Sequence, residues 1–265
     1  MPCNPIRRRL FSLAAIAIAG LAWIDRSTAS DAAGNVILVY HRFGPVVADS
    51  MTVTTPVFES QLEWLAAHHY HVVPLRDLVE RLGDRSARPD PHAVAITADD
   101  GHRSVFTEMF PLIQRYKVPV TLFIYPSAIS NASYALTWGE VTEMEQSGLI
   151  DVQSHSFWHP NFKTEAGRLD RGAYEKFVAM QLTRSRDVIA THSTTAVDML
   201  AWPFGIHDPD LEQAARRAGY IAGFTLERKH VEPEDDHLAL PRYLVTDLDR
   251  GPRFGSIFGN RVGDK

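Results

Sequence analysis

Residues 93–105 read AVAITADDGHRSV, an apolar run that ends at two adjacent aspartates and a glycine. An uninterrupted apolar run of this kind is typical of a strand buried on both faces, as in a parallel sheet. Two neighbouring carboxylates repel each other, so their place at a strand end calls for a chemical reason. Polar groups gather at the carboxyl ends of parallel strands mainly where a protein has its active site.

Strand-like and helix-like segments alternate on both sides of this stretch. Strand character is found at 36–41, 72–75, 93–97, 118–125, 150–155, 198–205, 221–226 and 238–245, and helical periodicity at 58–69, 76–82, 105–116, 139–148, 175–192 and 209–220. Seven or eight βα units with short connections predict a parallel sheet, doubly wound or closed into a barrel. Because neither an internal repeat nor a hinge interrupts this order, we expect a single α/β domain.

The N-terminus has the pattern of an export signal. Three arginines (7–9) precede an apolar stretch at 10–24, and the small residues STASDAAG follow at 27–34. The apolar stretch is shorter than the ~20 residues that a membrane-spanning helix needs. We therefore expect residues 1–30 to be a signal peptide, with an N-terminal membrane anchor as the alternative, and residues 31–265 to be the functional domain. The protein would then act in the periplasm or outside the cell.

The composition limits the kinds of partner. The chain has 265 residues, 45% of them hydrophobic, and a net charge of −5. The calculated pI is near 6.2, so neither the net charge nor the pI suggests a nucleic-acid partner. Cys3, the one cysteine, precedes the apolar stretch, so the exported part would fold without disulfides.

Metal-ligand residue types follow two of the predicted strands. His155 and His159 lie four residues apart, and we expect them to share one side of a helical turn that Pro160 ends. Together with a carboxylate from Asp99 or Asp100, they would leave the fourth position of a zinc-like ion open, as in catalytic sites. Taken singly, the aspartates also fit a polar turn, and the histidines a capping or core pair.

The remaining parts of a hydrolytic site can be assigned in the same way. A bound cation acidifies its water, and the second aspartate is placed to take the proton. Cleavage of an amide or ester also needs a proton donor for the leaving group and a donor to the oxyanion. His41, after another predicted strand, is the candidate proton donor, and a backbone N–H of the turn WPFG (202–205) is the candidate oxyanion donor.

Three segments in this order resemble a known family. TADDG (97–101), SHSFWHP (154–160) and WPFG (202–205) are similar to the first three motifs of the polysaccharide deacetylases, also called carbohydrate esterase family 4 or the NodB homology domain. The resemblance implies a distorted (β/α)7–8 TIM-like barrel. It also implies a divalent metal, Zn²⁺ with Co²⁺ or Ni²⁺ as alternatives, and deacetylation of acetylated sugars.

The resemblance assigns roles to individual residues. It makes Asp99 the catalytic base, the three residues Asp100, His155 and His159 the metal ligands, and the backbone N–H of Phe204 the oxyanion donor. We also expect the side chains of Trp202 and Pro203, inside the third motif, to contact the substrate.

Two departures from the family pattern concern proton transfer. Ala201 stands where the third motif usually has the arginine that orients the base, and we predict that Arg242 replaces it. The late histidine that usually acts as the acid is absent. However, ILVYHRFG (37–44) resembles the branch that deacetylates poly-β-1,6-N-acetylglucosamine, in which the acid histidine comes first, so we assign His41 as the acid.

The sequence thus predicts an exported, metal-dependent N-deacetylase that acts on a polysaccharide containing N-acetylglucosamine. Its partner would be the acetylated polysaccharide, with membrane association only through the N-terminal segment. An O-acetyl esterase acting on another glycan and a non-catalytic glycan-binding module are the alternatives.

Overall fold

The computed structural model describes residue 1 and residues 34–84 and 90–259. The predicted export signal at 1–30 lies, apart from Met1, outside the described residues. Within the described ranges, none of the helices combines the length and hydrophobicity that a membrane crossing requires.

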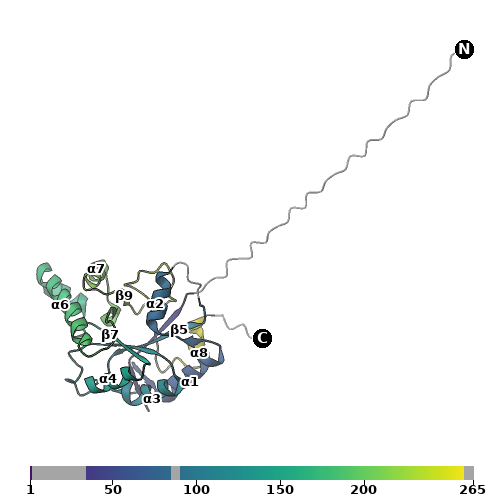
Figure 1. The fold of residues 1–265 in the computed structure, drawn as a ribbon, viewed down its shortest axis with the longest axis horizontal. Coiled ribbons are helices and arrows are strands. Elements are labelled where there is room, and N and C mark those ends of the chain that lie inside the picture. The colour runs from purple at the N-terminus through teal and green to yellow at the C-terminus, as the bar shows by residue number, and fades with distance from the viewer. Residues whose placement is uncertain (2–33, 85–89, 260–265) are drawn as a thin grey trace. The chain divides into compact units, whose positions relative to one another are not determined.

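A curled parallel sheet forms the centre of the fold (Figure 1). Its strands are β1 (Val36–Tyr40), β4 (His71–Val72), β5 (Ala93–Asp100), β6 (Val120–Ile124), β7 (Ile150–Ser154), β8 (Met199–Ala201), β9 (Ala222–Phe224) and β10 (Tyr243–Leu244). They are ordered β10-β1-β5-β6-β7-β8-β9, and β4 pairs with β5 off this path. Every pairing in the sheet is parallel. A separate parallel pair consists of β2 (Arg42–Gly44) and β3 (Thr52–Thr54).

Helices connect the strands and cover the outside of the sheet. They are α1 (Thr55–Ala67), α2 (Leu75–Gly83), α3 (Phe110–Tyr116), α4 (Trp138–Gln146), α5 (Phe162–Arg168), α6 (Arg171–Ala190), α7 (Pro209–Arg217) and α8 (Pro252–Gly255), with a π-helical turn at Val105–Met109 and 3₁₀ turns at Pro203–Gly205 and Ser256–Phe258. Several begin at strong N-caps. Thr137 and Glu140 form a capping box at α4, and Asp170 and Asp208 cap α6 and α7, which pack against each other (Figure 1).

The segment at 237–244 bridges the two edges of the sheet. Residues 237–240 bond to β9, with the N–H of Gly223 donating to the His237 carbonyl and the N–H of Thr225 donating to the Leu240 carbonyl. A few residues later β10 pairs with β1 at the opposite edge. This bridge turns the sheet into a distorted barrel and confirms the predicted fold class.

Side chains that alternate along the strands separate two apolar layers. The inner layer contains Ile37, Ala95, Phe123, Met199 and Phe224 from five strands, together with Leu75, Leu78 and Val79 of α2. The opposite faces of the strands pack against α1, α3 and α4, and near β8 against α6 and α7. The inner layer surrounds the space into which Asp99 and Arg242 project, both of them buried.

The structure departs from the predicted elements mainly where segments are short. Residues 72–75 were expected to form one strand, but β4 ends at Val72, Val73 keeps one hydrogen bond to β5, and α2 begins at Leu75. Helix α5 and the pair β2–β3 were not predicted, because three to seven residues carry too little periodicity to indicate an element.

Candidate active site

The register of the sheet brings the polar strand ends together. Through β6, Asp100 is level with Ser154 of β7, and His155 follows immediately. His41 follows β1 in the same way and is level with Asp99, because Tyr40 pairs with the residue before Asp99. Since all these strands are parallel, the side chains meet at one end of the barrel.

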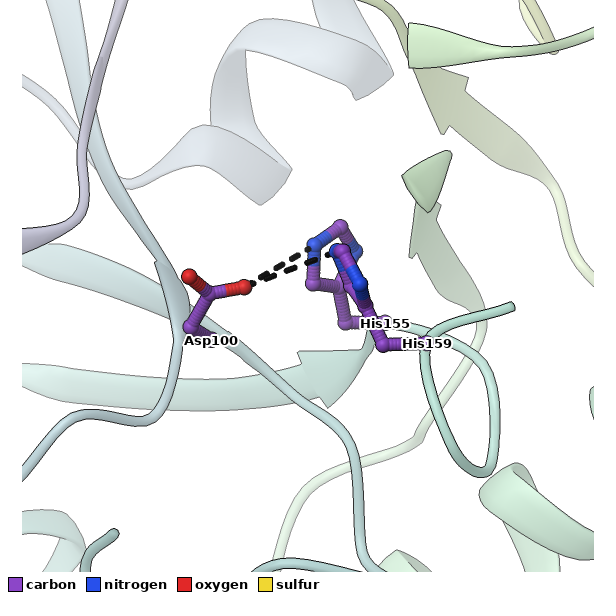
Figure 2. Close-up of side chains that lie close together, drawn as sticks. All are labelled: Asp100, His155 and His159. Atoms are coloured by element: carbon purple, nitrogen blue, oxygen red, sulfur yellow. Dashed lines mark ion pairs between the residues drawn. The ribbon is translucent and has the colours of Figure 1, made fainter. Parts of the chain in front are cut away.

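Asp100, His155 and His159 form a group of three potential ligands (Figure 2). Oδ1 of Asp100 lies 3.6 Å from Nε2 of His155 and 3.6 Å from Nε2 of His159. All three ligand atoms lie within 4.8 Å of one another. Ligand atoms that each sit ~2.0–2.2 Å from a tetrahedral ion are about 3.4 Å apart, so the spacing suits a Zn²⁺-like cation.

A hydrogen bond orients the ring of His155 as a metal ligand. Its Nδ1 lies 2.8 Å from the carbonyl oxygen of Ala201, which only accepts, so Nδ1 carries the proton. In a neutral ring the lone pair is then on Nε2, the atom that faces Asp100. Burial lowers the pKa of His159 to about 4, with His155 acting in the same direction and Asp100 opposing. Neutral imidazole is the form that binds a metal, so the donor set fits one.

The loop that carries the two histidines is not the helical turn that the sequence predicted. Residues 155–161 are irregular, and Ser156 and His159 have positive φ values of 61° and 63°. Hydrogen bonds hold the loop in this shape, among them the N–H of Trp158 to Oε1 of Gln181 at 3.0 Å and the N–H of His159 to Oγ of Ser156 at 3.2 Å. The prediction of a shared helical face was therefore wrong, although the rings still lie 4.6 Å apart.

Asp99 lies beside the group of three potential ligands and is hydrogen-bonded to Arg242. Nη1 and Nη2 of Arg242 donate to its two carboxylate oxygens at 2.8 and 2.7 Å, and both side chains are almost fully buried. Burial raises the pKa of Asp99, but the charge and hydrogen bonds of Arg242 together with the charges of His155 and His41 outweigh burial and lower that pKa to about 2. Asp99 is thus a fixed carboxylate, with Oδ2 3.9 Å from Nε2 of His155.

Arg242 occupies the middle of the segment that bridges the sheet edges. Its Nε donates to the Thr225 carbonyl at 3.1 Å, and its Nη1 also donates to Oγ1 of Thr97 at 3.1 Å. The rings of Phe123 and Phe224 lie 5.4 and 5.9 Å from the guanidinium carbon. The predicted substitute for the missing motif arginine therefore reaches Asp99 from a distant part of the chain.

One ring nitrogen of His41 is buried without a hydrogen bond. Within the part of the chain that the structure describes, its Nδ1 is the one buried side-chain nitrogen or oxygen that lacks a hydrogen-bond partner. Burial lowers the pKa of His41, while the charges of Asp99 and Asp100 raise it. A buried polar atom without a partner costs about 1–3 kcal/mol, so its retention points to a function at this site.

The turn at Pro203–Gly205 borders the site from β8. Phe204 has φ 57° and ψ 13°, and its exposed ring lies 4.6 Å from the ring of His159, so its backbone is next to the ligand group. Trp202, in contrast, is fully buried, and its Nε1 donates to the Leu238 carbonyl at 2.7 Å. Pro203 is buried as well. The predicted contacts of Trp202 and Pro203 with a substrate are therefore wrong: both side chains belong to the core.

A pocket of about 330 Å³ opens beside the group of three. Arg42, Asp100, His102, Tyr125 and Tyr134 line it. The two tyrosines were not predicted as site residues. Tyr125 could have been found from its position directly after β6, where the neighbouring strands carry Asp100 and His155, but no pattern in the sequence indicates Tyr134.

Comparisons with known proteins agree with this geometry. A model of the polysaccharide deacetylase family matches residues 86–223. The poly-beta-1,6-N-acetyl-D-glucosamine N-deacetylase of Staphylococcus epidermidis is 27% identical over 207 residues, which is 74% of this chain and 68% of that protein. The Staphylococcus aureus (strain MRSA252) protein of the same name is 25% identical over 201 residues, again 74% of this chain and 68% of that protein.

Two solved structures share the fold. IcaB from Ammonifex degensii is 25% identical, with a TM-score of 0.74 over 85% of this chain and 97% of that chain. The Streptococcus pyogenes deacetylase PplD, solved in complex with acetate, has a TM-score of 0.76 at 18% identity, over 85% of this chain and 98% of that chain. The similarity to PplD concerns the fold alone.

Proposed function

The chain belongs to the polysaccharide deacetylase family, and from this premise we propose that it is a metal-dependent hydrolase that removes N-acetyl groups from a polysaccharide of N-acetylglucosamine. One observation carries the proposal: an Asp-His-His group lies directly beside a second aspartate that a buried arginine holds ionised. The names of the two staphylococcal relatives support N-acetylglucosamine as the sugar.

Asp100, His155 and His159 would hold the metal. Two imidazole nitrogens and one carboxylate oxygen suit Zn²⁺, with Co²⁺ or Ni²⁺ as alternatives. When bound, such an ion polarises the acetyl carbonyl and makes a water molecule more acidic. The Ala201 carbonyl keeps Nε2 of His155 free for this purpose.

The remaining residues move protons and stabilise charge. Asp99 takes a proton from the attacking water while the water oxygen bonds to the acetyl carbon, and Arg242 keeps the carboxylate aligned. The N–H of Phe204 donates to the oxygen that gains negative charge. As the bond between carbon and nitrogen breaks, His41 gives a proton to the nitrogen, leaving acetate and a free amine on the sugar.

We also propose that the protein is exported. Residues 1–30 would act as a signal peptide, or as an anchor if they are not cleaved, and residues 31–265 would form the catalytic domain. The domain would then meet its polymer in the periplasm or outside the cell.

Acetate release from defined substrates tests the proposed function. Purified protein is reloaded with Zn²⁺, Co²⁺ or Ni²⁺ and incubated with N-acetylglucosamine oligomers in β-1,6 or β-1,4 linkage, and with acetylated xylan. We expect acetate from the N-acetylglucosamine oligomers, and a chelator should abolish it. Release from acetylated xylan alone would identify an O-acetyl esterase, and release from none of the substrates would contradict the enzymatic proposal.

A further inference from the structure

Two tyrosine hydroxyls face each other in the pocket beside Asp100. The hydroxyls of Tyr125 and Tyr134 lie 2.8 Å apart. Tyr134 is 48% exposed, and Tyr125 is partly buried with its ring 5.4 Å from that of His159. The pair therefore links the ligand group to the open side of the pocket.

The two tyrosine hydroxyls can form further hydrogen bonds with a ligand. One tyrosine hydroxyl donates to the other, which leaves one O–H proton and lone pairs on both oxygens for a ligand. Two adjacent hydroxyl groups of a sugar offer the complementary set of one acceptor and one donor.

The backbone holds Tyr134 in a fixed relation to the aspartate pair. Residues 102 and 135 form an antiparallel bridge. The N–H of Arg103 donates to the Tyr134 carbonyl at 2.8 Å, and the N–H of Leu136 donates to the Gly101 carbonyl at 2.9 Å. Because residue 101 directly follows Asp100, these bonds tie the backbone of Tyr134 to that of the aspartate pair, which suits a site that positions a substrate.

Arg42 lines the pocket from the β1 side. Its guanidinium is paired with Asp49 and its side chain is 38% exposed. Of the five N–H donors of an arginine, a single carboxylate uses at most two, so the others are available to sugar oxygens. The pocket volume of about 330 Å³ lies at the lower end of the ~300–1,000 Å³ typical of small-molecule sites, which suits one sugar ring.

We propose that Tyr125 and Tyr134 bind the two free secondary hydroxyls, O3 and O4, of the sugar ring whose acetamido group is hydrolysed. This inference rests on the proposed function and deepens it. The acetamido group is on C2, so O3 and O4 follow it along the ring edge and would enter the pocket beside Asp100. In a β-1,6-linked polymer both hydroxyls are free on every ring, whereas a β-1,4 linkage uses O4 on every ring but the last. The pair would therefore select for β-1,6 linkage.

The test compares linkage preference in wild-type protein with that in Tyr125→Phe and Tyr134→Phe. Each change removes one hydroxyl and keeps the ring. We measure kcat and KM for β-1,6 and β-1,4 pentamers of N-acetylglucosamine with metal-loaded protein. Tyr116→Phe on α3 is the matched control, since Tyr116 also loses hydroxyl bonds, to Glu59 and Glu63, but lies outside the pocket.

We expect the wild type to prefer the β-1,6 pentamer. Each pocket variant should lower kcat/KM for the β-1,6 pentamer by about 2- to 12-fold, mostly through KM. Because O3 is free in both linkages, only the variant whose tyrosine binds O4 should also lower the linkage preference by that factor. Tyr116→Phe should leave the preference unchanged. Equal losses on the two pentamers in both pocket variants, or a wild type without linkage preference, would overturn the inference while leaving the proposed function intact.

A wild type that releases no acetate would refute the proposed function instead. Binding of the β-1,6 pentamer, measured by calorimetry, then decides the inference separately. Weaker binding to Tyr134→Phe than to wild type and Tyr116→Phe would support the hydroxyl pair, and equal binding to all three would overturn it.

Discussion

Replacing Arg242 by Met should destabilise the protein far more than replacing an exposed arginine in a similar ion pair. Arg242 donates two hydrogen bonds to Asp99, at 2.8 and 2.7 Å, and neither side chain has more than 2% exposure. Removing one partner of such a pair leaves a buried charge without compensation, which costs about 3–5 kcal/mol. Asp99→Asn should have a similar cost because it leaves the guanidinium unpaired.

The matched control is the pair of Arg216 and Asp236 on the surface. Arg216 also contacts both carboxylate oxygens, at 2.8 and 2.9 Å, but the side chains are 54% and 46% exposed. Exposed pairs contribute about 0.2–1 kcal/mol, so Arg216→Met should cost no more than that. The two pairs thus have similar distances and differ in burial, and Arg216 makes both contacts through Nη2.

Urea denaturation of metal-free protein measures these free energies of unfolding. Metal-free protein is used because a bound cation near Asp99 would add its own stabilisation. The double variant Asp99→Asn with Arg242→Met should lose clearly less than the sum of the single losses, because no unpaired charge remains buried. A cost for Arg242→Met that is no greater than that for Arg216→Met would refute the assignment of Arg242 as the residue that holds the base.

Three further predictions concern other parts of the site and its support. His41→Ala should lower kcat by about 10²–10⁴-fold while the bound-metal content, measured by elemental analysis, stays as in wild type; loss of the metal instead would contradict its role as the acid. Gly205→Ala should lower the melting temperature, since φ is +68° and the new Cβ would lie 2.9 Å from the Leu226 nitrogen; an unchanged value would contradict this close approach. Asp247→Ala should cost about 1–3 kcal/mol in urea denaturation, because Asp247 accepts from the N–H and Oγ1 of Thr54 at 2.9 and 2.7 Å. These bonds together with the ion pair to Arg250 outweigh burial and lower the pKa of Asp247, so its contribution should be present above pH ~4 and fade as the pH falls through the lowered pKa; a difference that is the same at every pH would contradict this.

The barrel and the position of the site could be predicted because they depend on strong, repeated signals. Apolar runs such as 93–97 indicate strands buried on both faces, and polar residues directly after them must lie at one end of a parallel sheet. This placement is shared by His41, Asp99, Asp100 and His155. Their proximity could therefore be predicted from the sequence.

What the sequence could not predict depends on contacts between distant segments. Trp202 is buried against Leu238, to whose carbonyl its Nε1 donates, and Leu238 is 36 residues away along the chain. The positive φ values of Ser156 and His159 contradict the usual preference of residues with a side chain, so a helical turn was the expected but wrong prediction. A single antiparallel bridge between residues 102 and 135 brings Tyr134 to the site, and no pattern in the sequence indicates this bridge.

The division of labour between the two adjacent aspartates is the central claim, and one paired measurement tests it most directly. Bound zinc and the rate of acetate release from a β-1,6 N-acetylglucosamine oligomer are determined for wild type, Asp99→Asn and Asp100→Asn. We expect Asp99→Asn to bind zinc with wild-type stoichiometry and to lose about 10²–10⁴-fold in kcat, and Asp100→Asn to lose the zinc itself. Wild-type kcat in Asp99→Asn, or undiminished zinc binding in Asp100→Asn, would contradict the account.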